Sequence, residues 1–93
     1  MVIRYGGEEF LIILLDAEQA MTVADKIRNA LASMEFRAAG ETFYKTMSLG
    51  ISAYPTDSTD FVECISFSDI ALYQAKEQGR DRALTYKAGM KGE

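Results

Sequence analysis

The first fifteen residues carry the strongest hydrophobic pattern of the chain. Every position from Phe10 to Leu15 is apolar, which is typical of a strand covered on both faces. The β-prone run Val2–Tyr5 precedes it, and Gly6-Gly7 separates the two runs. Glycine pairs supply the positive φ angles that tight hairpin turns require. The pattern therefore predicts a β-hairpin with its second arm at Glu8–Leu15.

The next segment changes to a helical rhythm. Asp16 stands at its start as a candidate N-cap, and Gln19 follows three positions later as a capping-box partner. Apolar side chains then recur at helical spacing at Ala20, Ala24, Ile27, Leu31 and Met34. We predict an amphipathic helix directly after the hairpin.

Residues 35–53 predict two strands joined by a turn near Ala39-Gly40-Glu41. In the second of these strands, alternate positions hold Phe43, Lys45, Met47, Leu49 and Ile51. Pro55 ends that strand, because proline cannot donate a backbone hydrogen bond to a neighbouring strand. This pattern predicts a second hairpin.

The C-terminal third predicts a second helix from about Asp60 to Gln78. Ser66 and Ser68 are expected to mark a break, with Ser68 capping a second helical segment. Gly79 is well placed as the stop signal, because glycine readily adopts the left-handed conformation that ends many helices. We therefore predict helical structure that ends before Gly79.

The last residues predict a strand at Arg82–Tyr86 and a frayed tail at Lys87–Glu93. The full order is β-hairpin, helix, β-hairpin, helix, strand. This order predicts an α+β fold, in which flanking helices pack on a mostly antiparallel sheet. A chain of 93 residues forms one domain at most.

Composition and charge exclude several classes of protein. The net charge of −4 does not indicate binding to nucleic acid or to an anionic membrane surface. With one cysteine, Cys64, and no histidine, the chain has no internal disulfide, and a thiolate or imidazole zinc site is not expected. Cys64 is expected to be a small core residue. A single core cysteine fits a reducing compartment, so we expect a cytoplasmic protein. The run Phe10–Leu15 is too short to span a membrane, and no signal-peptide pattern opens the chain.

Three motifs spread over nearly the whole chain resemble one known family. Arg4-Tyr5-Gly6-Gly7-Glu8-Glu9-Phe10 is similar to the signature of GGDEF domains, in the common GGEEF variant. Met47 to Ser52 resembles the Ser-hydrophobic-Gly strand of that family. Ser68 to Lys76, followed by Gly79-Arg80-Asp81, resembles its A-D-x-A-L-Y-x-A-K-x-x-G-R-N segment. GGDEF domains are diguanylate cyclases, which condense two GTP into cyclic di-GMP. The resemblance implies the C-terminal portion of this nucleotidyl-cyclase, palm-like fold.

The resemblance implies that the first motif is catalytic. In the family, the position of Glu8 holds the catalytic metal, which implies Mg²⁺ or Mn²⁺ bound there. Glu9 is implied to be an active-site acid that assists deprotonation of the attacking 3′-hydroxyl. Gly6 and Gly7 have no Cβ, which leaves room for a nucleotide against the backbone. Taken without the family, the same residues are a bare hairpin turn with two solvated acids.

The resemblance also implies a phosphate site and an inhibitory site. Residues that match Lys76 and Arg80 hold the β- and γ-phosphates of GTP in the family. Taken alone, two cations at a helix C-terminus are explained by the helix dipole. Arg28 matches a position that contacts cyclic di-GMP at an inhibitory site in many relatives. A surface arginine is the alternative.

An intact GGDEF domain is longer than this chain, which matches its C-terminal portion. In the family, a further strand with a metal-binding acid lies between the strands that match Glu8–Leu15 and Met47–Ile51. Lacking it, the chain alone is expected to be inactive, and the unpaired edges favour a homodimer or higher oligomer. The alternatives to a catalytic half-domain are a module that binds cyclic di-GMP or GTP without catalysis, and a purely structural fragment.

Overall fold

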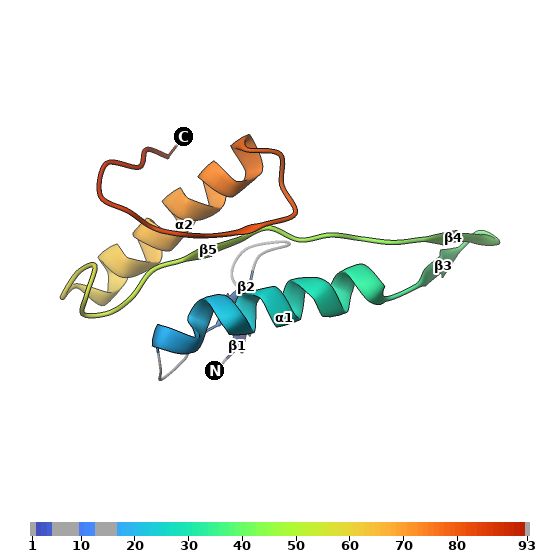
Figure 1. Cartoon of the computed structure of the whole chain (residues 1–93), viewed down its shortest axis with the longest axis horizontal. Coiled ribbons are helices and arrows are strands. Elements are labelled where there is room, and N and C mark those ends of the chain that lie inside the picture. Colours follow the sequence, from blue (N-terminus) through green and yellow to red (C-terminus); the bar gives the residue numbers. More distant parts are fainter. Residues whose placement is uncertain (1, 5–9, 13–16, 93) are drawn as a thin grey trace.

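Among the described residues, the strands form three separate pairs, and the β5–β6 pair lies between the two helices (Figure 1). The computed structural model describes residues 2–4, 10–12 and 17–92. Strand β1 (Val2–Arg4) pairs antiparallel with β2 (Phe10–Ile12), and Arg4 lies opposite Phe10. These two arms confirm the hairpin expected near the N-terminus. The predicted Gly6-Gly7 turn, the rest of the second arm and the Asp16 cap lie outside the described residues.

The first helical segment begins with a short 3₁₀ turn, η1 (Ala17–Gln19), and continues as α1 (Ala20–Ser33). Gln19 is the N-cap of α1, and its side chain makes no capping hydrogen bond. The predicted apolar stripe is only partly covered, because Ala24 is buried and Met34 is 52% exposed. Helix α1 packs against β5 and β6, the pair of strands that also carries the second helix.

The prediction of one long strand after the turn is wrong, because these residues form two separate strands that pair with different partners. Strand β3 (Phe36–Ala38) pairs antiparallel with β4 (Glu41–Phe43) around a turn at Ala39 and Gly40, which have φ angles of 52° and 80°. Strand β5 (Leu49–Ile51) instead pairs parallel with β6 (Ala83–Thr85). Residues 44–48 between them form no strand.

Helix α2 (Phe61–Glu77) runs without the break predicted at Ser66 and Ser68. The Ser68 hydroxyl donates to the carbonyl of Ile65 at 2.7 Å, so it is satisfied inside the helix and caps nothing. The start of the helix is capped by Asp60, whose carboxylate accepts from the amides of Val62 and Glu63. One continuous helix therefore spans the region where two segments were expected.

Small residues bring α2 into close contact with the sheet. The buried apolar side chains among the described residues are Ala24, Cys64, Ala71 and Ala75, which confirms Cys64 as a core residue. Gly50 of β5 faces α2 at Ser68 and Leu72, where a Cβ would overlap the carbonyl oxygen of Ser68 and the backbone of Leu72. Backbone therefore packs on backbone, and only glycine fits at this position.

The chain extends well beyond the packed unit formed by β5, α2 and β6. Its radius of gyration is 14.2 Å, against about 12 Å for a compact domain of this length. The β3–β4 hairpin projects away from the helices and accounts for part of the long axis of 49 Å (Figure 1). No helix in the described ranges is both long and apolar enough to cross a membrane.

The residues after β6 fold back along α2, where the side-chain amide of Gln74 donates to the carbonyl of Lys91 at 2.6 Å. Fraying of residues 87–93 stays a prediction. The described architecture is an α+β arrangement, in which two of the three described strand pairs are antiparallel.

Candidate functional site

The C-terminal end of α2 is fixed by a pattern of backbone hydrogen bonds. The amide of Gly79 donates to the carbonyl of Lys76 at 3.3 Å, and the amide of Arg80 donates to the carbonyl of Ala75 at 2.9 Å. These two bonds form a Schellman motif, with Gly79 at a φ of 116°. The predicted helix stop is confirmed, and it places Lys76 in the last turn and Arg80 directly after it.

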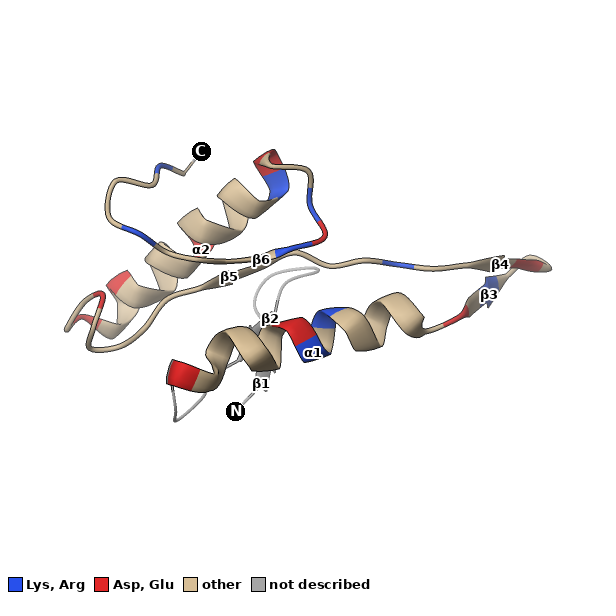
Figure 2. Cartoon of the chain, viewed as in Figure 1, with Lys and Arg blue, Asp and Glu red and all other residues tan. Residues whose placement is uncertain are grey.

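A groove of about 660 Å³ runs along α2 from Ser66 to the turn at Arg80. Its lining residues are Ser66, Asp69, Ile70, Leu72, Tyr73, Lys76, Glu77, Arg80 and Gly92. The cations Lys76 and Arg80 therefore share one groove with the acids Asp69 and Glu77. Figure 2 shows basic and acidic residues following one another where α2 ends. The lining is therefore mixed in charge, and phosphate binding by Lys76 and Arg80 stays a prediction.

Side chains, and not the helix dipole, must hold an anion in this groove. The C-terminal end of a helix carries partial negative charge, which disfavours an anion and favours cations such as Lys76. The ammonium of lysine is a compact point charge, and the guanidinium of arginine offers a planar fork of donors. Together Lys76 and Arg80 bring the two kinds of phosphate-binding cation to one groove.

Arg28 of α1 reaches the turn that follows α2. Its Nη1 donates to Oδ1 of Asp81 at 3.0 Å and to the carbonyl oxygen of Asp81 at 3.4 Å. Asp25, one turn earlier in α1, lies 3.6 Å from Nε of Arg28. The amide of Asp81 in turn donates to the hydroxyl of Ser48 at 3.1 Å. Arg28 is therefore a link between α1 and the turn after α2, and not an isolated surface arginine.

The structure brings together only some of the residues that the sequence singled out. Lys76 and Arg80 share the groove, and Arg28 contacts the same turn through Asp81. Gly6, Gly7, Glu8 and Glu9 lie outside the described residues. Their catalytic roles stay predictions.

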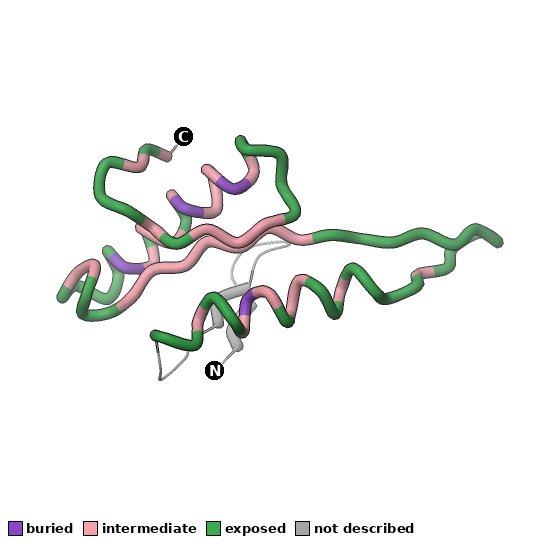
Figure 3. The backbone as a smooth tube through the Cα atoms, viewed as in Figure 1, coloured by how far each residue is buried: buried purple, intermediate pink, exposed green. Residues whose placement is uncertain are grey.

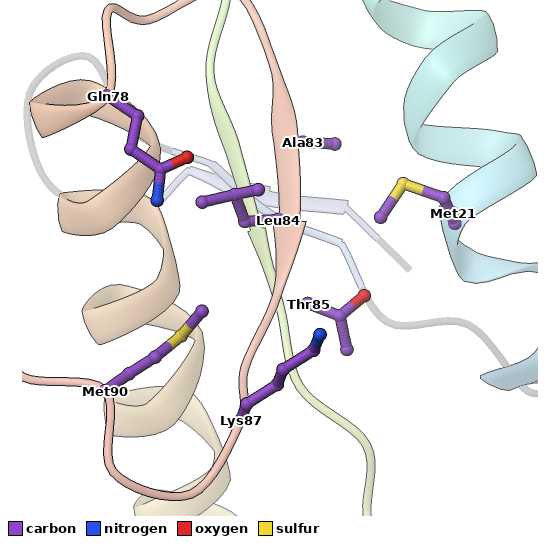
Figure 4. Close-up of a pocket in the computed structure, with 7 residues that line it drawn as sticks. All are labelled: Met21, Gln78, Ala83, Leu84, Thr85, Lys87 and Met90. Atoms are coloured by element: carbon purple, nitrogen blue, oxygen red, sulfur yellow. The ribbon is translucent and has the colours of Figure 1, made fainter.

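A second cavity, of about 400 Å³, lies along β6 (Figure 4). It is lined by Met21, Gln78, Ala83, Leu84, Thr85, Lys87 and Met90. In Figure 4, Leu84 points toward α2, and Met21 approaches from α1 on the other side of the strand. This cavity contains none of the predicted site residues and a single cation, so it does not fit a triphosphate.

A divalent cation has no candidate site of its own in residues 2–4, 10–12 and 17–92. Within those ranges, no three acidic, cysteine or histidine side chains gather closely enough to hold a metal ion. Glu8 and Glu9 lie outside those ranges, and their role as metal ligands stays a prediction.

The family model for "Diguanylate cyclase, GGDEF domain" matches residues 1–82. This chain belongs to the GGDEF family. The match covers the Gly-Gly-Glu-Glu motif, Lys76 and Arg80 in one alignment. It confirms the resemblance inferred from the three motifs.

Named GGDEF relatives match nearly the whole chain. Diguanylate cyclase A of Treponema denticola is 36% identical over 86 residues, which are 90% of this chain and 23% of that protein. Diguanylate cyclase DosC of Escherichia coli is 36% identical over 92 residues, which are 96% of this chain and 20% of that protein. The chain thus spans about a fifth of the length of these relatives.

Solved GGDEF domains share the fold. The active GGEEF domain of a diguanylate cyclase from Vibrio cholerae matches with a TM-score of 0.77 at 35% identity, over 92% of this chain and 55% of that one. A GGDEF domain from Pseudomonas aeruginosa matches with a TM-score of 0.79 at 29% identity, over 94% of this chain and 52% of that one. The chain therefore corresponds to about half of each solved domain.

Sequence reasoning missed Ser48 and the link between Arg28 and Asp81. Ser48 and Asp81 both belong to the family motifs. Asp81 lies 33 residues along the chain from Ser48 and 53 residues from Arg28. No periodicity relates residues at such separations. The family motif marks these positions as special without saying what they contact.

Proposed function

We propose that this chain is the C-terminal part of a diguanylate cyclase domain, which condenses two GTP into cyclic di-GMP. The observation that carries the proposal is the groove at the end of α2, which brings Lys76 and Arg80 together. Membership of the GGDEF family supports the same reaction, and so do the names of the relatives. We place the reaction in the cytoplasm, where GTP is available.

In this proposal, Lys76 and Arg80 bind the β- and γ-phosphates of one GTP. The Schellman motif fixes the backbone between them, so the two cations approach the triphosphate from a rigid helix end. Charge-assisted hydrogen bonds to phosphate are shorter and stronger than neutral ones, and arginine can make two of them in parallel. These contacts lie away from the reacting α-phosphorus and chiefly set affinity.

The Gly-Gly-Glu-Glu motif supplies the reacting end of the proposed site. Glu8 and Glu9 are the donors for Mg²⁺ or Mn²⁺, with Glu8 as the metal ligand. When bound, the cation supplies charge neutralisation at the phosphates. Gly6 and Gly7 leave the backbone open to the nucleotide. Glu9 accepts the proton of the attacking 3′-hydroxyl.

The reaction requires two such domains facing each other, each with one GTP. The 3′-oxygen of one GTP forms a bond to the α-phosphorus of the other, and the bond to pyrophosphate breaks. The second 3′-oxygen repeats the step, which closes the ring of cyclic di-GMP and releases a second pyrophosphate. The protein contributes mainly alignment, which supplies a large part of the rate of such reactions.

The test uses a complete GGDEF domain that contains this chain as its C-terminal part. Glu8→Gln keeps the shape of the side chain but removes the charge that a hard cation needs, so turnover is expected to fall below detection with the fold intact. Lys76→Ala is expected chiefly to raise KM for GTP. Near-normal turnover in the Glu8→Gln variant would refute the metal role.

The 93-residue chain on its own is expected to make no cyclic di-GMP. It spans about half of each solved GGDEF domain, and weak binding of one GTP does not align two substrates. The assay is chromatography after incubation with GTP and Mg²⁺. Product formation by the chain, with a silent Glu8→Ala control, would contradict this expectation.

We also propose that the chain associates into a homodimer or higher oligomer. In the described residues, β1–β2 and β5–β6 do not pair with each other, so each pair has open edges. Open strand edges are templates for association. Size exclusion with light scattering at micromolar concentration is expected to show a dimer or larger. A clean monomer that melts cooperatively would overturn the proposal.

Binding without catalysis is the alternative function, with cyclic di-GMP or GTP as the ligand. Arg28 remains the proposed contact for cyclic di-GMP at an inhibitory site. Its guanidinium already contacts Asp81, so an anionic ligand there competes with that carboxylate. Calorimetric titration with cyclic di-GMP and, separately, with GTP and Mg²⁺ distinguishes a binding module from a structural fragment.

A further inference from the structure

The turn that carries Arg80 has an unfavourable backbone conformation. Three consecutive residues have positive φ angles: Gly79 at 116°, Arg80 at 65° and Asp81 at 48°. Glycine adopts such angles readily and aspartate does so more readily than most residues, but Arg80 does so at a cost in free energy. The turn persists only if contacts from elsewhere hold it.

Two residues from distant parts of the chain, Arg28 and Ser48, hold this turn at Asp81. From α1, Nη1 of Arg28 donates to Oδ1 of Asp81 at 3.0 Å. From the segment before β5, the hydroxyl of Ser48 accepts from the amide of Asp81 at 3.1 Å. The backbone bonds of Arg80 are local, because its amide donates to Ala75 and its carbonyl accepts from Nε of Arg82. The Schellman bonds hold the helix side of Arg80, and the long-range contacts of Asp81 hold the residue that follows it, so the path of the chain after Arg80 depends on those contacts.

Arg28 is well suited to this task because it is partly enclosed. Its side chain is 25% exposed, compared with 78% for Arg37, which makes an ion pair with Glu35 on the surface. The Nε atom of Arg28 is buried and has no hydrogen-bond partner among the described residues, and Asp25 lies beside it at 3.6 Å. An enclosed guanidinium loses less freedom when it binds Asp81 than an exposed one does.

We propose that Arg28 is a positioning residue for the phosphate site: through Asp81 it fixes the turn that presents Arg80 to the groove. The inference rests on the proposed function only in assigning phosphate to Arg80. If the binding-competent turn is populated for only part of the time, the apparent affinity is reduced to that fraction of its full value. A loss of phosphate affinity without a loss of fold is therefore the signature of this role.

The first experiment needs no ligand. Amide hydrogen exchange at Arg80 and Asp81 is measured by NMR in the 93-residue chain and in its Arg28→Gln and Asp81→Asn variants. Exchange at Asp81 is expected to accelerate in both variants and to stay unchanged in the control Arg37→Gln. Unchanged exchange at Asp81 in Arg28→Gln would show that Arg28 does not hold the turn and would overturn the proposal.

The second experiment measures binding of inorganic triphosphate by calorimetry. Arg28→Gln and Asp81→Asn are each expected to weaken binding about threefold to tenfold, and the double variant no further, because both act through one link. Arg28→Lys is expected to restore part of the affinity. The melting temperature of Arg28→Gln is expected to stay close to that of Arg37→Gln.

The outcomes separate this proposal from the proposed function. If Lys76→Gln and Arg80→Gln leave triphosphate binding unchanged, or the chain binds none, the phosphate site itself is wrong. If those variants lose binding but Arg28→Gln does not, Arg80 is a phosphate ligand and the positioning role is refuted. Additive losses in the double variant would also refute it, because independent effects do not pass through one contact.

Discussion

The unit formed by β5, α2 and β6 and the hairpin formed by β3 and β4 use strands of equal length but differ in what holds them. In the first, β5 and β6 are half-buried against α2, whereas nearly every residue of the hairpin is exposed (Figure 3). The strands of the first are distant in sequence, and those of the second are joined by a two-residue turn. Tight packing between distant segments supports the site, and local contacts support the hairpin.

Contacts within the hairpin explain how it forms outside the core. The rings of Phe36 and Phe43 stack with centroids 5.7 Å apart, and Nζ of Lys45 lies 5.7 Å and 5.9 Å from the two centroids. Aromatic pairs and cation–π contacts of this kind add modest stability beyond burial. The hairpin therefore depends on neighbours only a few residues away.

The largest expected effect comes from Gly50→Ala in the packed unit. The new Cβ would overlap the backbone of Ser68 and Leu72, and backbone cannot move aside as a flexible side chain can. We expect a loss of about 3 kcal/mol or more, which is most of the stability of a small domain. Chemical denaturation followed by circular dichroism measures it.

Gly40→Ala is the matched control in the hairpin. Nothing lies within 4 Å of the place that a Cβ would occupy on Gly40, and only its φ of 80° opposes the change. A cost of about 1 kcal/mol is expected. Equal effects at Gly40 and Gly50 would refute the distinction between the two regions.

A smaller effect is expected from Asp60→Ala at the start of α2. The carboxylate of Asp60 accepts from the amides of Val62 and Glu63 at 3.0 and 3.5 Å, and its loss leaves both without this cap. The expected cost is about 1 kcal/mol in thermal unfolding. Asp60→Asn is expected to keep nearly full stability, since asparagine caps equally well; a loss as large as that of alanine would contradict a capping role.

The smallest global effect is expected from Phe43→Ala in the hairpin. The side chain is 38% exposed and packs chiefly on Phe36, so the free energy of unfolding should fall by no more than about 0.5 kcal/mol. Hydrogen exchange should accelerate within β3 and β4 and stay unchanged in α2. Faster exchange in α2 would show that the two regions are coupled, and Thr42→Ala serves as the exposed control.

Much of the candidate site was predictable because its signals are local. Gly79 as a helix stop follows from its place after a helical pattern, and the Schellman bonds confirm it. Lys76 and Arg80 were found by their motif, which has fixed spacing around that stop. Glu8 and Glu9 were found in the same way, and their roles remain proposals.

The two errors have different physical origins, one in distant strand partners and one in a bond within the helix. The pattern of residues 42–51 predicted one strand, but β4 and β5 pair with different partners on either side of residues 44–48. The serines of α2 predicted a break, but Ser68 satisfies its hydroxyl within the helix while Gly50 packs on its carbonyl. Alternation and capping signals do not report which partner a segment meets.

The sequence by itself determined the family, the two helices, the hairpin at β3–β4 and the end of α2. Each of these is set by residues within about one turn or one motif of one another, where spacing alone defines contact. Only the tertiary structure decided that β5 and β6 pair in parallel, that Gly50 admits the backbone of α2, and that Arg28 holds Asp81. Those contacts join segments that the chain brings together only on folding, and no local pattern encodes them.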